Sequence, residues 1–144
     1  MPSVSGGCHC GNVRVELQLP RDPGAYVPRA CDCDFCRKHA AAYVSDPHGA
    51  LRIWIRDERR AGRYRQGSGT AEMLVCRNCG VLIGALYPAE GSAYGVVNVR
   101  TLEERARFAP EQSVSPLSLS ASDKVRRWRE IWFADVSIIA GGDA

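Results

Sequence analysis

The chain of 144 residues lacks any long hydrophobic run. No uninterrupted apolar stretch approaches the roughly 18 residues that a membrane-spanning helix needs, so no membrane partner is expected. Residues 1–7 lack both a basic region and an apolar region, so the sequence predicts no signal peptide. A strong excess of one charge is also missing, because 19 Lys and Arg face 16 Asp and Glu. We therefore expect a cytoplasmic protein.

The composition does not depart from that of an ordinary globular domain. Hydrophobic residues make up 45% of the chain and charged residues 24%, which excludes a disordered chain or a coiled coil. A chain of this length suits one domain and buries enough apolar surface to form a core without metal. We predict a single domain over residues 1–144, and the sequence leaves its oligomeric state open.

Seven cysteines carry most of the information about function. An odd number cannot form a complete set of disulfides, and without a signal peptide close cysteine clusters favour metal binding or redox chemistry. In an extended chain residues i and i+2 point to one face, so a C-x-C pair presents two sulfurs to one ion. The clusters are Cys8-His9-Cys10-Gly11, Cys31-Asp32-Cys33-Asp34-Phe35-Cys36 and Cys76-Arg77-Asn78-Cys79-Gly80. The glycines Gly11 and Gly80 can adopt the positive φ of a tight turn around a metal.

The spacing divides the cysteines most simply into four and three. A closed zinc site has four protein ligands, whereas three ligands leave the open position that catalytic zinc requires. The local cluster is the natural three-ligand site, which we call the triplet: Cys31, Cys33 and Cys36. The remaining cysteines would close a structural site, which we call the quartet: Cys8, Cys10, Cys76 and Cys79. Two alternatives stay open, because the triplet could share ligands with Cys76 and Cys79, or His39 could complete it.

Two other functions compete with a catalytic zinc site. Cys76-x-x-Cys79 matches a redox motif, but such a motif normally opens a helix in an alternating strand–helix pattern, which the sequence lacks. A zinc-stabilised binding module without catalysis would need only closed sites. Nucleic acid is not an expected partner, since seven thiolates and two Zn²⁺ ions would bring the net charge of +3 to zero.

Strand patterns dominate the first hundred residues. Apolar residues alternate with polar ones over 13–19 and 51–56, and further strands are predicted at 73–75, 81–87 and 94–99. Gly- and Pro-containing turns separate them. We therefore predict a mainly β fold of small antiparallel sheets joined by metal.

Helices are predicted only late in the chain. Thr101 and Glu104 match a capping box ahead of a short helix. A second helix, capped by Ser122 or Asp123, would extend to about residue 133 after a loop over 110–122. Its apolar stripe is predicted to be core packing and consists of Val125, Trp128 and Trp132. The tail from residue 141 is predicted to fray.

The ordered set of clusters resembles a known family. Gly7-Cys8-His9-Cys10-Gly11-Asn12-Val13-Arg14, the triplet followed by Arg37-Lys38, and Cys76-x-x-Cys79-Gly80 together resemble the glutathione-dependent formaldehyde-activating enzyme family, whose domain is shared with centromere protein V. The similarity covers residues 5–108, and a loop and helix follow over 109–140. The resemblance implies a zinc-stapled β-tent with a structural zinc at the quartet and a catalytic zinc, held less firmly, at the triplet. It also makes His39 a neighbour of the triplet rather than a ligand.

The resemblance further implies a carbon–sulfur lyase that acts on a small thiol and an aldehyde. The family's assigned activity is the addition of glutathione to formaldehyde, which gives S-hydroxymethylglutathione. Zinc at the triplet would position a thiol and favour its thiolate. Arg37 and Lys38 are the candidate contacts for the carboxylates of glutathione. Family members often carry a histidine–aromatic segment near the C-terminus, which residues 113–122 lack, so we expect this region to alter the pocket.

Overall fold

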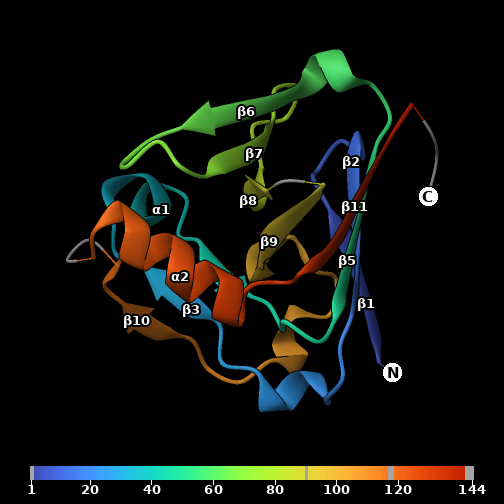
Figure 1. The fold of residues 1–144 in the computed structure, drawn as a ribbon. Coiled ribbons are helices and arrows are strands. Elements are labelled where there is room, and N and C mark those ends of the chain that lie inside the picture. Colours follow the sequence, from blue (N-terminus) through green and yellow to red (C-terminus); the bar gives the residue numbers. More distant parts are fainter. Residues whose placement is uncertain (1, 90, 117–118, 142–144) are drawn as a thin grey trace.

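The computed structural model describes residues 2–89, 91–116 and 119–141 (Figure 1). The described strands are β1 (Ser3–Gly7), β2 (Val13–Gln18), β3 (Arg29–Cys31), β4 (Ala42–Val44), β5 (Ala50–Ile55), β6 (Ala61–Arg65), β7 (Glu72–Cys76), β8 (Leu82–Ala89), β9 (Ser92–Asn98), β10 (Gln112–Val114) and β11 (Asp135–Ala140). The α-helices are α1 (Asp34–Lys38) and α2 (Ala121–Ile131), and short 3-10 turns occupy Pro23–Ala25, Glu58–Arg60, Val99–Thr101 and Arg105–Arg107. No helix of the described residues is long and apolar enough to cross a membrane.

One sheet has the order β1-β2-β5-β11 within the described residues. The alternation of β2 places Val13, Val15 and Leu17 in the core and turns the intervening polar residues outward. β2 pairs with β5 in antiparallel register, with Val15 opposite Ile53. β11 then adds to the far side of β5 in parallel register.

The other sheet has the order β10-β3-β4-β9-β8-β7-β6 in the part of the chain that the structure describes. Its central strands are buried on both faces. Neighbouring residues such as Val96 and Val97 therefore enter two different apolar clusters. Gly84 permits the close approach of β8 to β9, because a Cβ there would lie 2.0 Å from the Val96 carbonyl oxygen.

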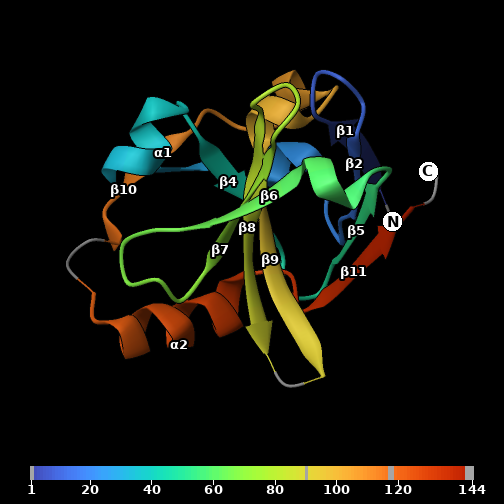
Figure 2. The same cartoon turned by 90° about the horizontal axis from the view of Figure 1, so that it is seen from above.

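The main core lies between the two sheets. It combines Leu17 and Ile53 of the first sheet with Leu74 and Val97 of the second, and Phe133 closes it after α2. A smaller cluster on the other face of the second sheet includes Cys33, Cys36, Tyr43, Met73 and Trp132. In Figures 1 and 2, α1, α2 and the turn between β6 and β7 lie on the side away from the first sheet.

The mainly β architecture with a C-terminal helix confirms the predicted fold class. The sheets are mixed rather than purely antiparallel, because β10 pairs in parallel with β3 and β11 with β5. The prediction of a helix after Thr101 is wrong. The Thr101 hydroxyl donates to the Asn98 carbonyl oxygen instead of capping a helix, and two short 3-10 turns occupy this region. Ser120, rather than Ser122 or Asp123, caps α2 by accepting from the Asp123 N–H. Of the predicted frayed tail, residues 142–144 lie outside the described residues.

Candidate metal centres and the adjoining cavity

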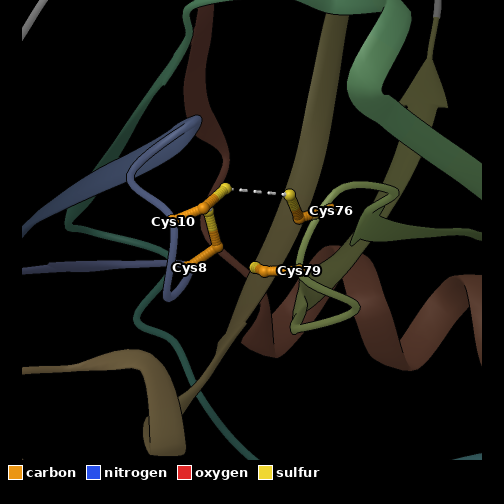
Figure 3. A group of neighbouring side chains, drawn as sticks. All are labelled: Cys8, Cys10, Cys76 and Cys79. Carbon is orange, nitrogen blue, oxygen red and sulfur yellow. Dashed lines mark hydrogen bonds between the residues drawn. The ribbon is translucent and has the colours of Figure 1, made fainter.

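The quartet lies where two tight turns meet at one end of the core. Cys8 and Cys10 follow β1, and Cys76 ends β7 with Cys79 in the turn before β8 (Figure 3). Gly11 and Gly80 follow these pairs with φ of +85° and +83°, which confirms the predicted glycine turns. The Gly80 N–H donates to the Cys76 carbonyl oxygen over 2.8 Å and closes the second turn.

The spacing of the quartet sulfurs fits a tetrahedral zinc ion. All four sulfurs lie within 4.8 Å of one another. The Cys8 and Cys10 sulfurs are 3.7 Å apart, and those of Cys10 and Cys76 are 3.6 Å apart. Zn–S bonds of about 2.3 Å in a tetrahedron place sulfurs roughly 3.8 Å apart. A disulfide would require about 2.05 Å, and all seven cysteines are free. The donor set therefore suits a closed four-sulfur zinc site.

The triplet lies at the junction of β3 and α1. Cys31 ends β3, Cys33 caps α1 and Cys36 lies within that helix. The Cys33 sulfur accepts from the Cys36 N–H at 3.4 Å, so the cap holds two of the three sulfurs in place. The three sulfurs also lie within 4.8 Å of one another, and no described His, Asp or Glu joins the group. The donor set fits zinc with one position left free by the protein.

Polar neighbours of the triplet come from outside its own segment. The Tyr43 hydroxyl on β4 lies 3.1 Å from the Cys36 sulfur, and the Gln66 side-chain amide lies 4.0 Å from the Cys33 sulfur. Burial raises the pKa of Tyr43, so the phenol keeps its proton at neutral pH. A hydrogen bond from the Cys36 thiol lowers the pKa of Cys31 to about 6. At least one sulfur of the triplet is therefore a thiolate near neutral pH.

The triplet opens into a cavity of about 410 Å³, within the usual size range of small-molecule sites. The second sheet forms the floor with Met73, Ala85 and Val96. The turn between β6 and β7 forms one side with Gln66, and α2 forms the opposite wall. The three cysteines thus line a partly open cavity large enough for an organic ligand.

The wall from α2 combines cations with apolar side chains. Lys124, Arg127, Trp128 and Ile131 line the cavity at the i, i+3, i+4 and i+7 spacing of one helix face. Trp132 follows directly and stacks on Trp128 with ring centroids 4.7 Å apart. The prediction that the two tryptophans pack in the core is thus incomplete, because both also line the cavity.

Arg29 on β3 adds a third cation to the lining. Its guanidinium donates to the Ser45 hydroxyl at 2.7 Å, and this hydroxyl donates to the Ile131 carbonyl oxygen at 2.6 Å. Burial, together with the nearby charge of Arg127, lowers the pKa of Arg29 to about 10. The group still carries its charge at neutral pH.

The predicted glutathione contacts lie elsewhere. Arg37 and Lys38 are exposed at the end of α1 and are not among the residues that line the cavity. His39 caps the same helix and packs against Phe35 with ring centroids 4.8 Å apart, outside the sulfur group. Among the described residues, the cations that do line the cavity are Arg29, Lys124 and Arg127.

A signal for these residues existed in the sequence. Arg29 stands two residues before Cys31, so the two share a face if the segment is extended. The stripe from Lys124 to Ile131 has helical spacing but mixes charge with aromatic side chains, and a search for a purely apolar stripe misses it.

Two comparisons relate the chain to known proteins. A family model described as glutathione-dependent formaldehyde-activating enzyme matches residues 3–115. A crystal structure of a Rhodobacter sphaeroides protein, a structural genomics target, is 31% identical and has a TM-score of 0.54. That match covers 75% of this chain and 99% of the other. The family match contains both cysteine groups and ends before α2 and β11.

Proposed function

Because the chain belongs to the glutathione-dependent formaldehyde-activating enzyme family, we propose that it is a zinc-dependent carbon–sulfur lyase that joins a small thiol to an aldehyde. The observation that carries this proposal is the position of a three-sulfur group in the lining of a partly open cavity. A purely structural site has no need of an open ligand position or of a cavity beside it. In the synthetic direction the thiol sulfur bonds to the aldehyde carbon, the C=O π bond breaks, and the thiol proton passes to the new hydroxyl.

The proposed division of labour assigns the triplet to catalysis and the quartet to stability. When bound at the triplet, zinc supplies an open position and lowers the pKa of a thiol that enters it. Once Cys36 is a thiolate, the Tyr43 hydroxyl donates the hydrogen bond in their 3.1 Å contact. This bond adjusts the strength of the Cys36 sulfur as a zinc ligand. Apolar side chains on the floor exclude water from the reacting sulfur and strengthen electrostatic contacts there.

The first test is zinc per chain on reduced protein, measured with and without glutathione. We expect two zinc ions, and we expect glutathione to change the accessibility of one of them to a chelating dye. One zinc ion that is indifferent to glutathione would instead favour a zinc-stabilised binding module. The Cys33→Ala variant is the matched control, because it should keep the quartet zinc and lose the response to thiol.

The second test is the rate of adduct exchange. Thiol and formaldehyde add without a catalyst, so the measurement is exchange between free thiol and hydroxymethyl adduct by magnetisation-transfer NMR. The wild type should accelerate exchange, and Cys33→Ala should return it to the uncatalysed rate while the fold is retained. Equal rates with and without wild-type protein for glutathione and other small thiols would refute the lyase proposal.

A further inference from the structure

The cavity beside the triplet carries positive charge that no protein carboxylate balances. Its described lining includes Arg29, Lys124 and Arg127 and contains no Asp or Glu. None of these three cations forms an ion pair with a described carboxylate. Arg29 and Lys124 are partly buried and Arg127 is exposed. Because partly buried charges are normally paired, this unbalanced lining indicates an anionic ligand.

Arg29 is the most constrained of the three cations. Its side chain is only partly exposed, and the one hydrogen bond that it makes goes to the neutral Ser45 hydroxyl. A guanidinium has five donors in a planar fork, so most donors of Arg29 have no protein partner among the described residues. Asp46 and Glu130 line a neighbouring depression with Arg29, but neither lies within ion-pair distance of it. The fork is therefore free to receive a carboxylate from a ligand.

Beyond the cations and sulfurs, the lining combines polar side chains such as Gln66 and Ser115 with a larger apolar and partly aromatic surface. Trp128 is held between Tyr87 and Trp132, with ring centroids 5.6 Å and 4.7 Å away, so its ring is a fixed surface. Ile131 lines the same wall, and Met73 forms part of the opposing floor. A polar peptide would leave these surfaces unmatched, whereas a phenyl or branched alkyl group would cover them.

We propose that the preferred thiol of this enzyme is a mercaptocarboxylate with an apolar body, whose carboxylate binds Arg29 and Arg127 and whose apolar group packs on Trp128. This inference rests on the proposed function, because it takes the triplet as the position of the thiol. Charge balance agrees with it. A zinc ion with three thiolates has a net charge of −1, which leaves the three-cation cavity near +2. A ligand with one thiolate and one carboxylate neutralises that excess.

Two of the three specificity residues of this proposal come from outside the matched family domain, and Arg29 lies within it. The family match ends at residue 115, and Arg127 and Trp128 lie on α2 beyond it. The helix is anchored by β11, which pairs with β5, and by backbone hydrogen bonds between Phe133 and Gly95. A helix beyond the matched range thus shares with Arg29 the recognition of what reaches the triplet.

The test measures the affinities of four probes for zinc-loaded protein by tryptophan fluorescence and calorimetry. The four probes are α-mercaptohydrocinnamate, phenethyl thiol without the carboxylate, hydrocinnamate without the thiol, and glutathione. We expect α-mercaptohydrocinnamate to bind at least tenfold more tightly than glutathione or phenethyl thiol, which corresponds to one charge-assisted hydrogen-bonded contact. Equal affinity of α-mercaptohydrocinnamate and phenethyl thiol would overturn the proposal.

Matched variants on α2 separate the cavity cation from general charge effects. Arg127→Gln should weaken α-mercaptohydrocinnamate and hydrocinnamate about tenfold and leave phenethyl thiol unchanged. Arg126→Gln removes the same charge from the neighbouring residue, whose exposed side chain pairs with Asp123, and should change no affinity by more than about twofold. Equal effects of the two variants would show that α2 acts only through long-range charge, against the proposal.

The thiol-free probe distinguishes failure of this inference from failure of the proposed function. If the triplet does not bind thiols, the affinity for hydrocinnamate still depends on Arg127, and α-mercaptohydrocinnamate binds no more tightly than hydrocinnamate. If the cavity does not recognise acids, thiols still bind and react, but without any dependence on Arg127. Trp128→Ala adds a second readout, since it should weaken the phenyl-bearing probes and spare glutathione.

Discussion

The two cysteine groups should respond very differently to the loss of one sulfur. Cys8 and Cys33 are matched, because their side chains are 6% and 7% exposed, so truncation to alanine removes a similar packing contribution. A metal at the quartet would link Cys10 to Cys76, which are 66 residues apart. Treated as a cross-link that restricts the unfolded chain, a loop of that length contributes about 4 kcal/mol to the free energy of unfolding. The triplet closes only a short local loop, for which the same relation gives about 2 kcal/mol at most.

Thermal unfolding of Cys8→Ala and Cys33→Ala at saturating zinc measures this difference. For a chain of this size we expect Cys8→Ala to lower Tm by roughly 10–20 °C. By the same conversion the short metal loop of the triplet accounts for roughly 5–10 °C at most, so Cys33→Ala should lower Tm by less than Cys8→Ala although it also loses the α1 cap. In excess chelator the difference in Tm between Cys8→Ala and wild type should nearly vanish, because both proteins then lack the metal that cross-links the quartet. Equal losses of Tm for the two variants in zinc would refute the assignment of structural and catalytic sites.

Three further substitutions test single contacts. Tyr43→Phe removes the hydroxyl beside the Cys36 sulfur and should slow adduct exchange about tenfold, at unchanged zinc content, in the NMR assay. His39→Ala should retain both zinc ions by elemental analysis, and the loss of one ion would show that His39 is a zinc ligand. Gly80→Ala places a side chain at φ +83°, so it should lower the free energy of unfolding by about 1–2 kcal/mol and weaken zinc binding in a competition titration. Gly91→Ala is the control, because it should cost similar stability at φ +69° and leave zinc affinity unchanged.

Local patterns in the sequence predicted the central elements well. Period-two alternation marked β2 and β5, and glycine placement marked both turns of the quartet. These features depend on residues next to one another in the chain, so they can be read without knowledge of the fold.

Elements that depend on distant partners were missed. β11 is a short apolar run after a helix, and only its pairing with β5, more than 80 residues earlier, makes it a strand. The capping box at Thr101 failed because Asn98 offers its carbonyl oxygen to the same hydroxyl. The cavity was missed for a similar reason. It combines β3 with α2, and neither segment alone shows that its cations face a common space.

The position of β11 has a consequence for how the molecule matures. All seven cysteines precede residue 80, whereas α2 and β11 occupy 121–140 and are synthesised after them. A nascent chain therefore contains these seven sulfur donors before α2, one wall of the cavity, has been synthesised, and that wall does not yet cover the triplet. In refolding of the full chain we expect zinc uptake to precede the change in tryptophan fluorescence. If the triplet takes up zinc in that interval, metal binding would precede completion of the cavity that selects the ligand.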